Sequence, residues 1–303
     1  MEKNMKKDQW RFKTAGNKFL MFSNAQDFLS RFAIFHFSLL ALRSTLIITL
    51  VAGCATVPII GRQQLSLIPA GQLVTMSNQS FDQLIKESRI STDQEKSAMS
   101  ERVGERIAGA TEEFLWETGQ GYKVRDFDWE FVLIDEPDNI NAFAMPGGKI
   151  GAYSGIFKVA QSEEDLAAVI AHEVAHVIAN HGGERMSQYL LVSLGGLSLD
   201  LALQKKEVET RKWWLVAYGL GSTVGYVLPY SRLQEREADR IGLILMAMAG
   251  YNPEAAIGLW ERMNEQSKSR IPAFLSTHPA PQARIAEIRA RIPEAMKYYK
   301  KRQ

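Results

Sequence analysis

The chain has 303 residues, a formal net charge of +2 and a single cysteine, Cys54. Of its 36 Lys and Arg residues, eight precede Cys54, whereas only three of its 34 Asp and Glu residues do, so residues 54–303 carry 28 basic side chains against 31 acidic ones. This mildly negative part has no basic footprint for nucleic acid, and a lone cysteine excludes a disulfide within the chain. A segment of this length can bury one substantial core.

The N-terminal segment has the organisation of a secretory signal. Basic residues precede an apolar stretch, and small residues follow in Val51-Ala52-Gly53-Cys54. This last pattern resembles the bacterial lipobox, where processing attaches lipid to the new N-terminal cysteine. It predicts a lipoprotein signal peptide at 1–53, a lipidated Cys54 and a domain at 54–303; an uncleaved membrane anchor is the alternative. Ala55 is not the aspartate associated with inner-membrane retention in enteric bacteria, so we expect attachment to the periplasmic side of the outer membrane.

Helices and a hairpin are predicted in the next part of the chain. Apolar positions recur with helical spacing over residues 70–116, whereas residues 129–134 have the composition of a strand. Pro146-Gly147 suits the central positions of a type II turn, because glycine accepts the positive φ that the second position needs. We therefore expect a hairpin with strands at 141–145 and 149–157.

The segment His172-Glu173-Val174-Ala175-His176 carries the strongest chemical signal. A serine and three acidic residues at 162–165 predict the start of a helix, and Asn180 with Gly182-Gly183 predicts its end. Two histidines four positions apart lie one turn apart on a helix, so they can bind one zinc ion. Zinc lowers the pKa of a bound water toward about 7, and Glu173 could then take its proton. The pattern predicts a metal-dependent hydrolase, although two ordinary histidines on a helix would produce it too.

A catalytic zinc site needs a third protein ligand. The solution with a third histidine just downstream is excluded, because Ala179 and Gly182 occupy its glycine and histidine positions. The other common solution is a glutamate on a second helix, and Glu235 and Asp239 share one face of a predicted helix, from which Glu237 points away. Glu235 could complete the site while Asp239 accepts the second ring proton of a ligand histidine. An exposed, charged helix start is the alternative.

The uncharged residues 213–230 could span a membrane, but they are at the short limit for a span, contain three glycines and end near Pro229. We expect instead helices packed over the active site, which could form a lid. Residues 252–254, Asn-Pro-Glu, predict another helix with proline at its first position, and a short basic helix follows Pro281.

Four segments together resemble the zinc metallopeptidases that include HtpX, Oma and the CAAX prenyl proteases. They are Asn141-Ala142-Phe143-Ala144-Met145-Pro146-Gly147-Gly148, His172 to His176, Ser231 to Asp239, and Leu275-Ser276-Thr277-His278-Pro279. The resemblance covers most of the chain after Cys54. It implies an α+β fold, mainly helical and of the gluzincin type, with a small β-sheet or hairpin beside the active-site helix. It also implies one Zn²⁺ bound by His172, His176 and Glu235, with Glu173 as general base. Asp239 would contact a ligand histidine rather than the metal.

The same resemblance implies further residues near the metal. Its Ser-Thr-His-Pro segment approaches the metal, so His278 could stabilise the transition state or occupy the open coordination position; a capping histidine in a turn is the alternative. His181 is expected to be a surface or cap residue. In zinc peptidases of this general kind an exposed strand near the metal binds extended substrate as a further strand, and a purely structural hairpin is equally compatible. The candidate substrate-binding residues are Asn141, Ala142, Phe143 and Ala144.

The resemblance to the periplasmic members BepA and LoiP predicts a lipid-anchored zinc endopeptidase that cleaves misfolded or misassembled envelope proteins. The alternative is a zinc-bound chaperone or outer-membrane assembly factor with little proteolysis. Glu173 counts against that alternative, since binding alone requires no general base. A third hypothesis is an integral membrane protease. The expected partners are unfolded or misassembled polypeptides and, through lipidated Cys54, the membrane, with no nucleic acid.

Overall fold

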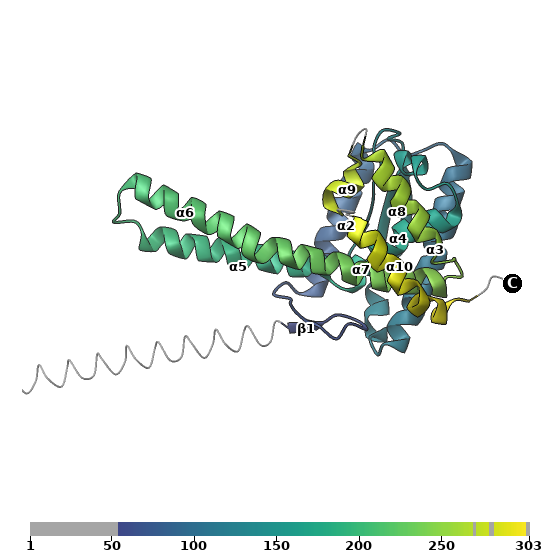
Figure 1. Ribbon diagram of the computed structural model, residues 1–303, viewed down its shortest axis with the longest axis horizontal. Helices are drawn as coiled ribbons and strands as arrows, with labels where there is room; N and C mark the ends of the chain where they lie inside the picture. The colour runs from purple at the N-terminus through teal and green to yellow at the C-terminus, as the bar shows by residue number, and fades with distance from the viewer. Residues whose placement is uncertain (1–53, 269–270, 279–281, 301–303) are drawn as a thin grey trace, which may run out of the picture. The chain divides into compact units, whose positions relative to one another are not determined.

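A computed structural model of the protein describes residues 54–268, 271–278 and 282–300, so the signal peptide expected at 1–53 lies outside the described residues. Most of these residues are helical, and two small sheets accompany the helices (Figure 1). The strands are β1 (Cys54–Thr56), β2 (Gln63–Leu65), β3 (Glu130–Ile134), β4 (Ala142–Met145) and β5 (Lys149–Tyr153). The α-helices are α2 (Ala70–Glu87), α3 (Gln94–Glu117), α4 (Glu163–Ile178), α5 (His181–Ala202), α6 (Val208–Ser222), α7 (Leu228–Met248), α8 (Ala255–Gln266), α9 (Ala273–Thr277) and α10 (Gln282–Ala295). The expected mainly helical α+β fold is confirmed.

The larger sheet has the strand order β3-β5-β4, in which β5 pairs parallel with β3 and antiparallel with β4. The turn between β4 and β5 is the predicted one, because Gly148 N–H donates to Met145 O at 3.2 Å and Gly147 has a φ of 91°. The second strand ends earlier than predicted. Residues 154–158 form a 3₁₀ turn, because Gly155 packs against the loop before β4, where its N–H donates to Glu136 O.

Helix α4 is the central element of the described core. Its N-terminus is capped as predicted, with Ser162 Oγ accepting from Asp165 N–H at 3.2 Å. The helix packs most extensively against α7 and also contacts α3, α8 and β4. Gly242 permits the close approach of α7, since a Cβ there would lie 3.1 Å from the backbone of His172. This approach brings the acidic side chains of α7 to the histidines of α4.

Two of the predicted helices have other bounds. The segment 70–116 is two helices, because residues 88–93 join the edge of the sheet, where Ser91 N–H donates to Leu133 O at 2.8 Å. Asp93 then caps α3 by accepting from Lys96 N–H. Helix α8 begins at Ala255, two residues after Pro253, because residues 252–254 form a turn in which the Asn252 side chain accepts from Glu254 N–H.

The end of α4 differs from the expectation in one respect. Asn180 ends the helix with a left-handed φ of 55°, as predicted, but α5 begins at once with His181. The glycines at 182 and 183 therefore lie inside α5 rather than in a loop. A second helix thus follows the His172–His176 segment directly, at an angle set by one left-handed residue.

Helices α5 and α6 run side by side as a long helical hairpin (Figure 1). Tyr218 Oη donates to Val192 O at 3.0 Å, and Arg211 pairs with Asp200 at 2.5 Å. Helix α6 contains no buried residue, and its main helical partner is α5, so the expected packing of this segment over the active site is wrong. Both helices have exposed apolar residues. Because apolar residues are usually buried, the sequence analysis predicted that this segment would pack over the active site.

No helix in the described part of the chain has both the length and the apolar character required to cross a membrane.

Candidate metal centre

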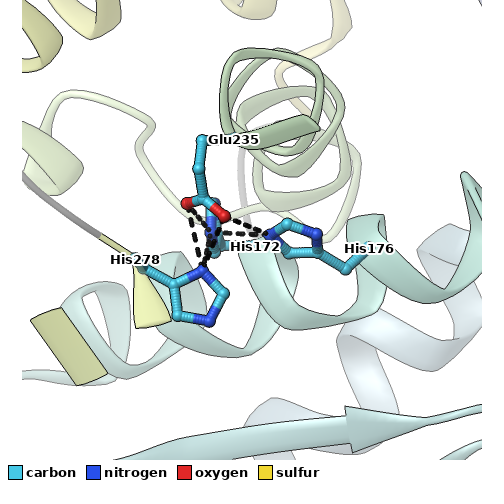
Figure 2. A group of neighbouring side chains, drawn as sticks. All are labelled: His172, His176, Glu235 and His278. Carbon is cyan, nitrogen blue, oxygen red and sulfur yellow. Dashed lines mark hydrogen bonds and ion pairs between the residues drawn. The ribbon is translucent and has the colours of Figure 1, made fainter. Parts of the chain in front are cut away.

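Four side chains, from α4, α7 and the residue that follows α9, converge in the described core. His172, His176, Glu235 and His278 offer ligand atoms that all lie within 4.8 Å of one another, and all four residues are buried. Figure 2 shows their polar ends pointing toward one another. His172 Nε2 lies 3.2 Å from His176 Nε2 and 3.3 Å from His278 Nδ1. Glu235 carboxylate oxygens lie 3.3 Å from His176 Nε2 and 3.0 Å from His278 Nδ1.

The local structure explains why these residues meet. His172 and His176 are one turn apart on α4, so both rings leave the same face of the helix. Glu235 lies on α7, which continues directly from a π-helical turn at 223–227, and Pro229, which has no N–H to donate, follows that irregular turn. His278 follows α9 and donates its N–H to Phe274 O at 2.8 Å. Phe274 N–H in turn donates to Ile140 O, which links this segment to the residue two positions before β4.

The donor set fits a divalent transition metal. Imidazole nitrogens and a carboxylate oxygen are the ligands that zinc takes in catalytic sites. Burial disfavours the charged form of His172, but hydrogen bonds with Asp239 and Glu235 raise its pKa to about 9. Burial, outweighing the effect of Glu235, lowers the pKa of His176 well below its usual value. A bound dication would balance the negative charge of these carboxylates in place of a protonated histidine, because metal binding requires neutral imidazoles.

Glu173 lies beside this cluster and is 6% exposed. Its Oε1 accepts no hydrogen bond from the described residues, and His278 Nε2 is 3.4 Å away. A buried carboxyl oxygen without a donor is costly, and a water or substrate at the cluster would supply a donor. The arrangement leaves the carboxylate of Glu173 available for proton transfer.

Asp239 takes the position that the sequence predicts. Its Oδ1 lies 3.0 Å from His172 Nδ1, the ring nitrogen that faces away from the other three side chains. Burial raises the pKa of this carboxyl, but the charge of Arg284 and the hydrogen bond with His172 lower it on balance. The carboxylate can therefore hold the proton of His172 on Nδ1 and leave Nε2 free for a metal.

Arg284 belongs to the site, although the sequence analysis did not identify it as a site residue. It is 5% exposed, donates from Nε and Nη2 to the two oxygens of Asp239 at 2.8 Å, and lies 3.1 Å from Glu235 Oε2. Its guanidinium lies over the ring of Trp260, 3.9 Å from the centroid. The sequence analysis placed it only on a short basic helix after Pro281. No local signal distinguishes it, since an arginine at the start of α10 has the same sequence pattern whether it is buried or exposed.

His181 is not a surface residue, so that expectation was wrong. It is fully buried, with its Nδ1 2.9 Å from His176 Nδ1 and its Nε2 3.0 Å from Glu237 Oε2. Glu237 leaves α7 on another face from Glu235, as expected, but it is buried and also pairs with Arg62 at 2.7 Å. The immediate start of α5 after Asn180 turns His181 back toward α4.

The candidate substrate residues lie at the edge of the sheet. β4 is one of the two edge strands of the sheet and contacts α4. Phe143 packs against Phe81 and Tyr153, with ring centroids 6.5 and 6.1 Å away. Asn141 precedes the strand, and its carbonyl accepts from Tyr153 N–H. Cys54, the predicted lipidation site, begins β1 and pairs with Leu65 in β2.

Comparison with known proteins agrees with this geometry. Residues 102–292 match the model of peptidase family M48. The chain is 42% identical over 176 residues to the mitochondrial metalloendopeptidase OMA1 of Schizosaccharomyces pombe, covering 56% of this chain and 48% of the relative. It is 34% identical over 181 residues to OMA1 of Saccharomyces cerevisiae, covering 56% and 49%. It is 31% identical over 172 residues to the beta-barrel assembly-enhancing protease of Escherichia coli K12, covering 54% and 34%. The matches thus span about half or less of each of these relatives.

Proposed function

The chain belongs to peptidase family M48, as the resemblance of its four motifs predicted, and on this premise we propose that it is a zinc-dependent endopeptidase. Its substrates in this proposal are misfolded or misassembled proteins of the bacterial envelope. The observation that carries the proposal is the convergence of His172, His176 and Glu235 beside the buried carboxylate of Glu173, whose Oε1 accepts no hydrogen bond from the described residues. Two of the relatives compared above are named metalloendopeptidases, which supports the same reaction class.

His172, His176 and Glu235 would hold the zinc ion. When bound, zinc would polarise the peptide carbonyl and lower the pKa of water at the site. The three ligands come from two helices, α4 and α7, whose close approach Gly242 permits. Because their positions do not depend on a loop, the site is held by the core of the domain.

Glu173 is the general base in this proposal. Its carboxylate would accept a proton from the attacking water and return it to the leaving amine. His278 lies 3.4 Å from Glu173 and 3.0 Å from Glu235, so its ring can reach groups that bind between them. We assign to it a hydrogen bond to the carbonyl oxygen as negative charge develops there.

An extended substrate would bind along β4, the edge strand beside α4. Pairing with the strand at Asn141 to Ala144 would use backbone hydrogen bonds, so side-chain requirements would be few. Low side-chain selectivity suits an enzyme that acts on unfolded chains of many sequences. The relative from Escherichia coli is named a beta-barrel assembly-enhancing protease, and this supports substrates in the envelope. Lipidation of Cys54 would keep the enzyme at the outer membrane.

The direct test is degradation of an unfolded protein by zinc-loaded protein and by its Glu173→Gln variant. The substitution keeps the size of the side chain and removes the base. Cleavage by the wild type alone supports the proposal. Zinc binding without cleavage by either protein supports the chaperone alternative, and equal cleavage by both refutes the role of Glu173.

A further inference from the structure

We propose that His181, Glu237 and Arg62 position the metal ligand His176, and that the β1–β2 hairpin is thereby part of the metal centre. The inference deepens the proposed function and rests on it, because it takes His176 as a ligand. It concerns residues outside the zinc motif, and Arg62 lies outside the residues that match the family. The residues form a continuous chain of contacts from β1–β2 to the cluster.

The first contact fixes the proton of His176. Its Nε2 faces Glu235 and His172, at 3.3 and 3.2 Å, so this nitrogen is the one that would bind the metal. A neutral imidazole that binds through Nε2 carries its proton on Nδ1. That proton points at His181 Nδ1, 2.9 Å away, which must then be the acceptor.

The second contact follows from the first. Since His181 accepts at Nδ1, its own proton is on Nε2, where it is donated to Glu237 Oε2 at 3.0 Å. The order of donors and acceptors along the chain is thus set by a single condition, namely that Nε2 of His176 is free. Glu237, through His181, gives His176 the orientation that Asp239 gives His172 directly.

Helix α7 therefore supports both histidine ligands, His172 and His176. Asp239 reaches His172 from the face that carries Glu235, and Glu237 reaches His181 from another face. Because these acidic residues lie within five positions of one helix, a rotation of α7 would disturb a ligand and both supports together. The supporting contacts stabilise the same helix orientation that Glu235 requires.

Arg62 holds the far end of the chain. It donates from Nε to Glu237 Oε1 at 2.7 Å and from Nη1 and Nη2 to Glu184 at 2.7 and 2.8 Å. Glu184 and Glu237 are 1% and 3% exposed, so without a cation between them two carboxylates would be buried close together. The carboxylate of Glu237 thus lies within hydrogen-bond distance of both Arg62 and His181 Nε2, and it can accept from both.

The segment that carries Arg62 is docked on the junction between α4 and α5. Gln64 Nε2 donates to Ala179 O at 2.7 Å, and Leu67 N–H donates to Ser187 Oγ at 2.9 Å. Asn180, the left-handed residue of the junction, donates to Ser66 Oγ at 3.3 Å. The residues that follow the predicted lipidation site thus hold the turn from which His181 projects.

The test compares zinc affinity in the purified full-length protein and four variants. His181→Phe keeps the ring and cannot take part in the chain, whereas His181→Gln offers one acceptor and one N–H donor, as a neutral imidazole does. Arg62→Lys keeps the charge but loses the two-pronged contacts that the guanidinium makes with Glu184 and Glu237. Gln188→Leu is the control, because Gln188 is equally buried on α5 and its side chain makes no hydrogen bond among the described residues.

Affinity is measured by competition with a chromophoric chelator, and the visible spectrum of the Co²⁺-loaded protein reports ligand geometry. Melting of the metal-free protein separates a positioning role from a structural one. We expect His181→Phe to bind zinc about 10- to 100-fold more weakly and to alter the Co²⁺ spectrum. His181→Gln should recover most of the affinity, Arg62→Lys should lose part of it, and Gln188→Leu should match the wild type.

Unchanged affinity in His181→Phe overturns the inference. So does weaker binding that His181→Gln shares in full and that is matched by lower melting of the metal-free protein, because that result describes a structural residue. Unchanged affinity in Arg62→Lys removes the β1–β2 hairpin from the metal centre. If the wild type itself binds no zinc, the proposed function fails and this inference fails with it. If the wild type binds zinc and His181→Phe binds it equally well, only this inference fails.

Discussion

Replacement of Arg284 by methionine isolates the charge that balances the acidic side chains of the metal centre. Arg284 bridges Asp239 and lies 3.1 Å from Glu235, all three being buried. Methionine retains an unbranched apolar side chain that can cover Trp260. The substitution therefore removes charge and hydrogen bonds while keeping most of the packing.

The size of the effect follows from these contacts. Removal of one partner from a buried ion pair lowers the free energy of unfolding by about 3–5 kcal/mol. His172 remains 3.0 Å from Asp239, with a pKa raised to about 9, so it offsets part of the loss in the metal-free protein. We expect the lower end, about 3 kcal/mol, which for a domain of this size lowers the melting temperature by about 6–12 °C.

The assay is thermal unfolding of the metal-free protein, followed by circular dichroism at neutral pH. Asp239→Asn in the Arg284→Met background is the matched test, because it removes the carboxylate left without its partner and should restore part of the stability. Zinc should reduce the effect of Arg284→Met, since the ion compensates Glu235. A melting temperature within about 2 °C of wild type for the metal-free variant would refute the argument.

Three further predictions concern the ligands and the surface. Glu235→Gln should weaken zinc retention because the amide is a poorer ligand than the carboxylate, and unchanged metal content after dialysis would exclude this ligand. His278→Ala should change the rate of cleavage without abolishing zinc binding; wild-type kinetics would remove His278 from the site. Arg240 donates three hydrogen bonds to Glu294 and holds the pKa of its carboxyl below the usual value for glutamate. The stabilisation by this ion pair is complete above the usual pKa of glutamate and is lost as the pH falls through the lower pKa of folded Glu294. Glu294→Gln should therefore lower the free energy of unfolding by at most about 1 kcal/mol at pH 7 and not at all at strongly acid pH. An equal loss at both pH values, measured by urea unfolding, would contradict this.

The parts of the site that sequence analysis predicted depend on local chemistry. The spacing of His172 and His176 fixes their common face once a helix forms, and Ser162 supplies its cap. The turn at Pro146-Gly147 follows from the positive φ that glycine accepts. Glu235 and Asp239 were predicted because the requirement for a third ligand selects one face of the next acidic helix.

The parts that were missed depend on contacts distant in sequence. Arg284 lies 112 positions from His172, and Arg62 lies 122 positions from Glu184, so no periodicity relates the partners. A lone arginine on a basic helix has the same local pattern whether it is buried or exposed. His181 was misjudged because a residue after a helix stop is usually solvated, and only the left-handed Asn180 returns it to the core.

The segment 213–230 shows the limit of hydropathy as a guide to burial. Its apolar residues predicted burial over the active site, yet α6 contains no buried residue. Trp213 and Leu220 are 68% and 63% exposed. Apolar composition indicates a surface that avoids water, but it does not indicate which other surface covers it.

The measurement that tests the account most directly is a zinc titration of chelator-stripped protein, with cleavage of an unfolded protein followed at each point. The account predicts that activity rises with added zinc and saturates at one ion per chain. Glu173→Gln should bind the same single ion without gaining activity. Cleavage that is independent of zinc, or that persists in Glu173→Gln, would contradict the assignment of a zinc peptidase with Glu173 as its base.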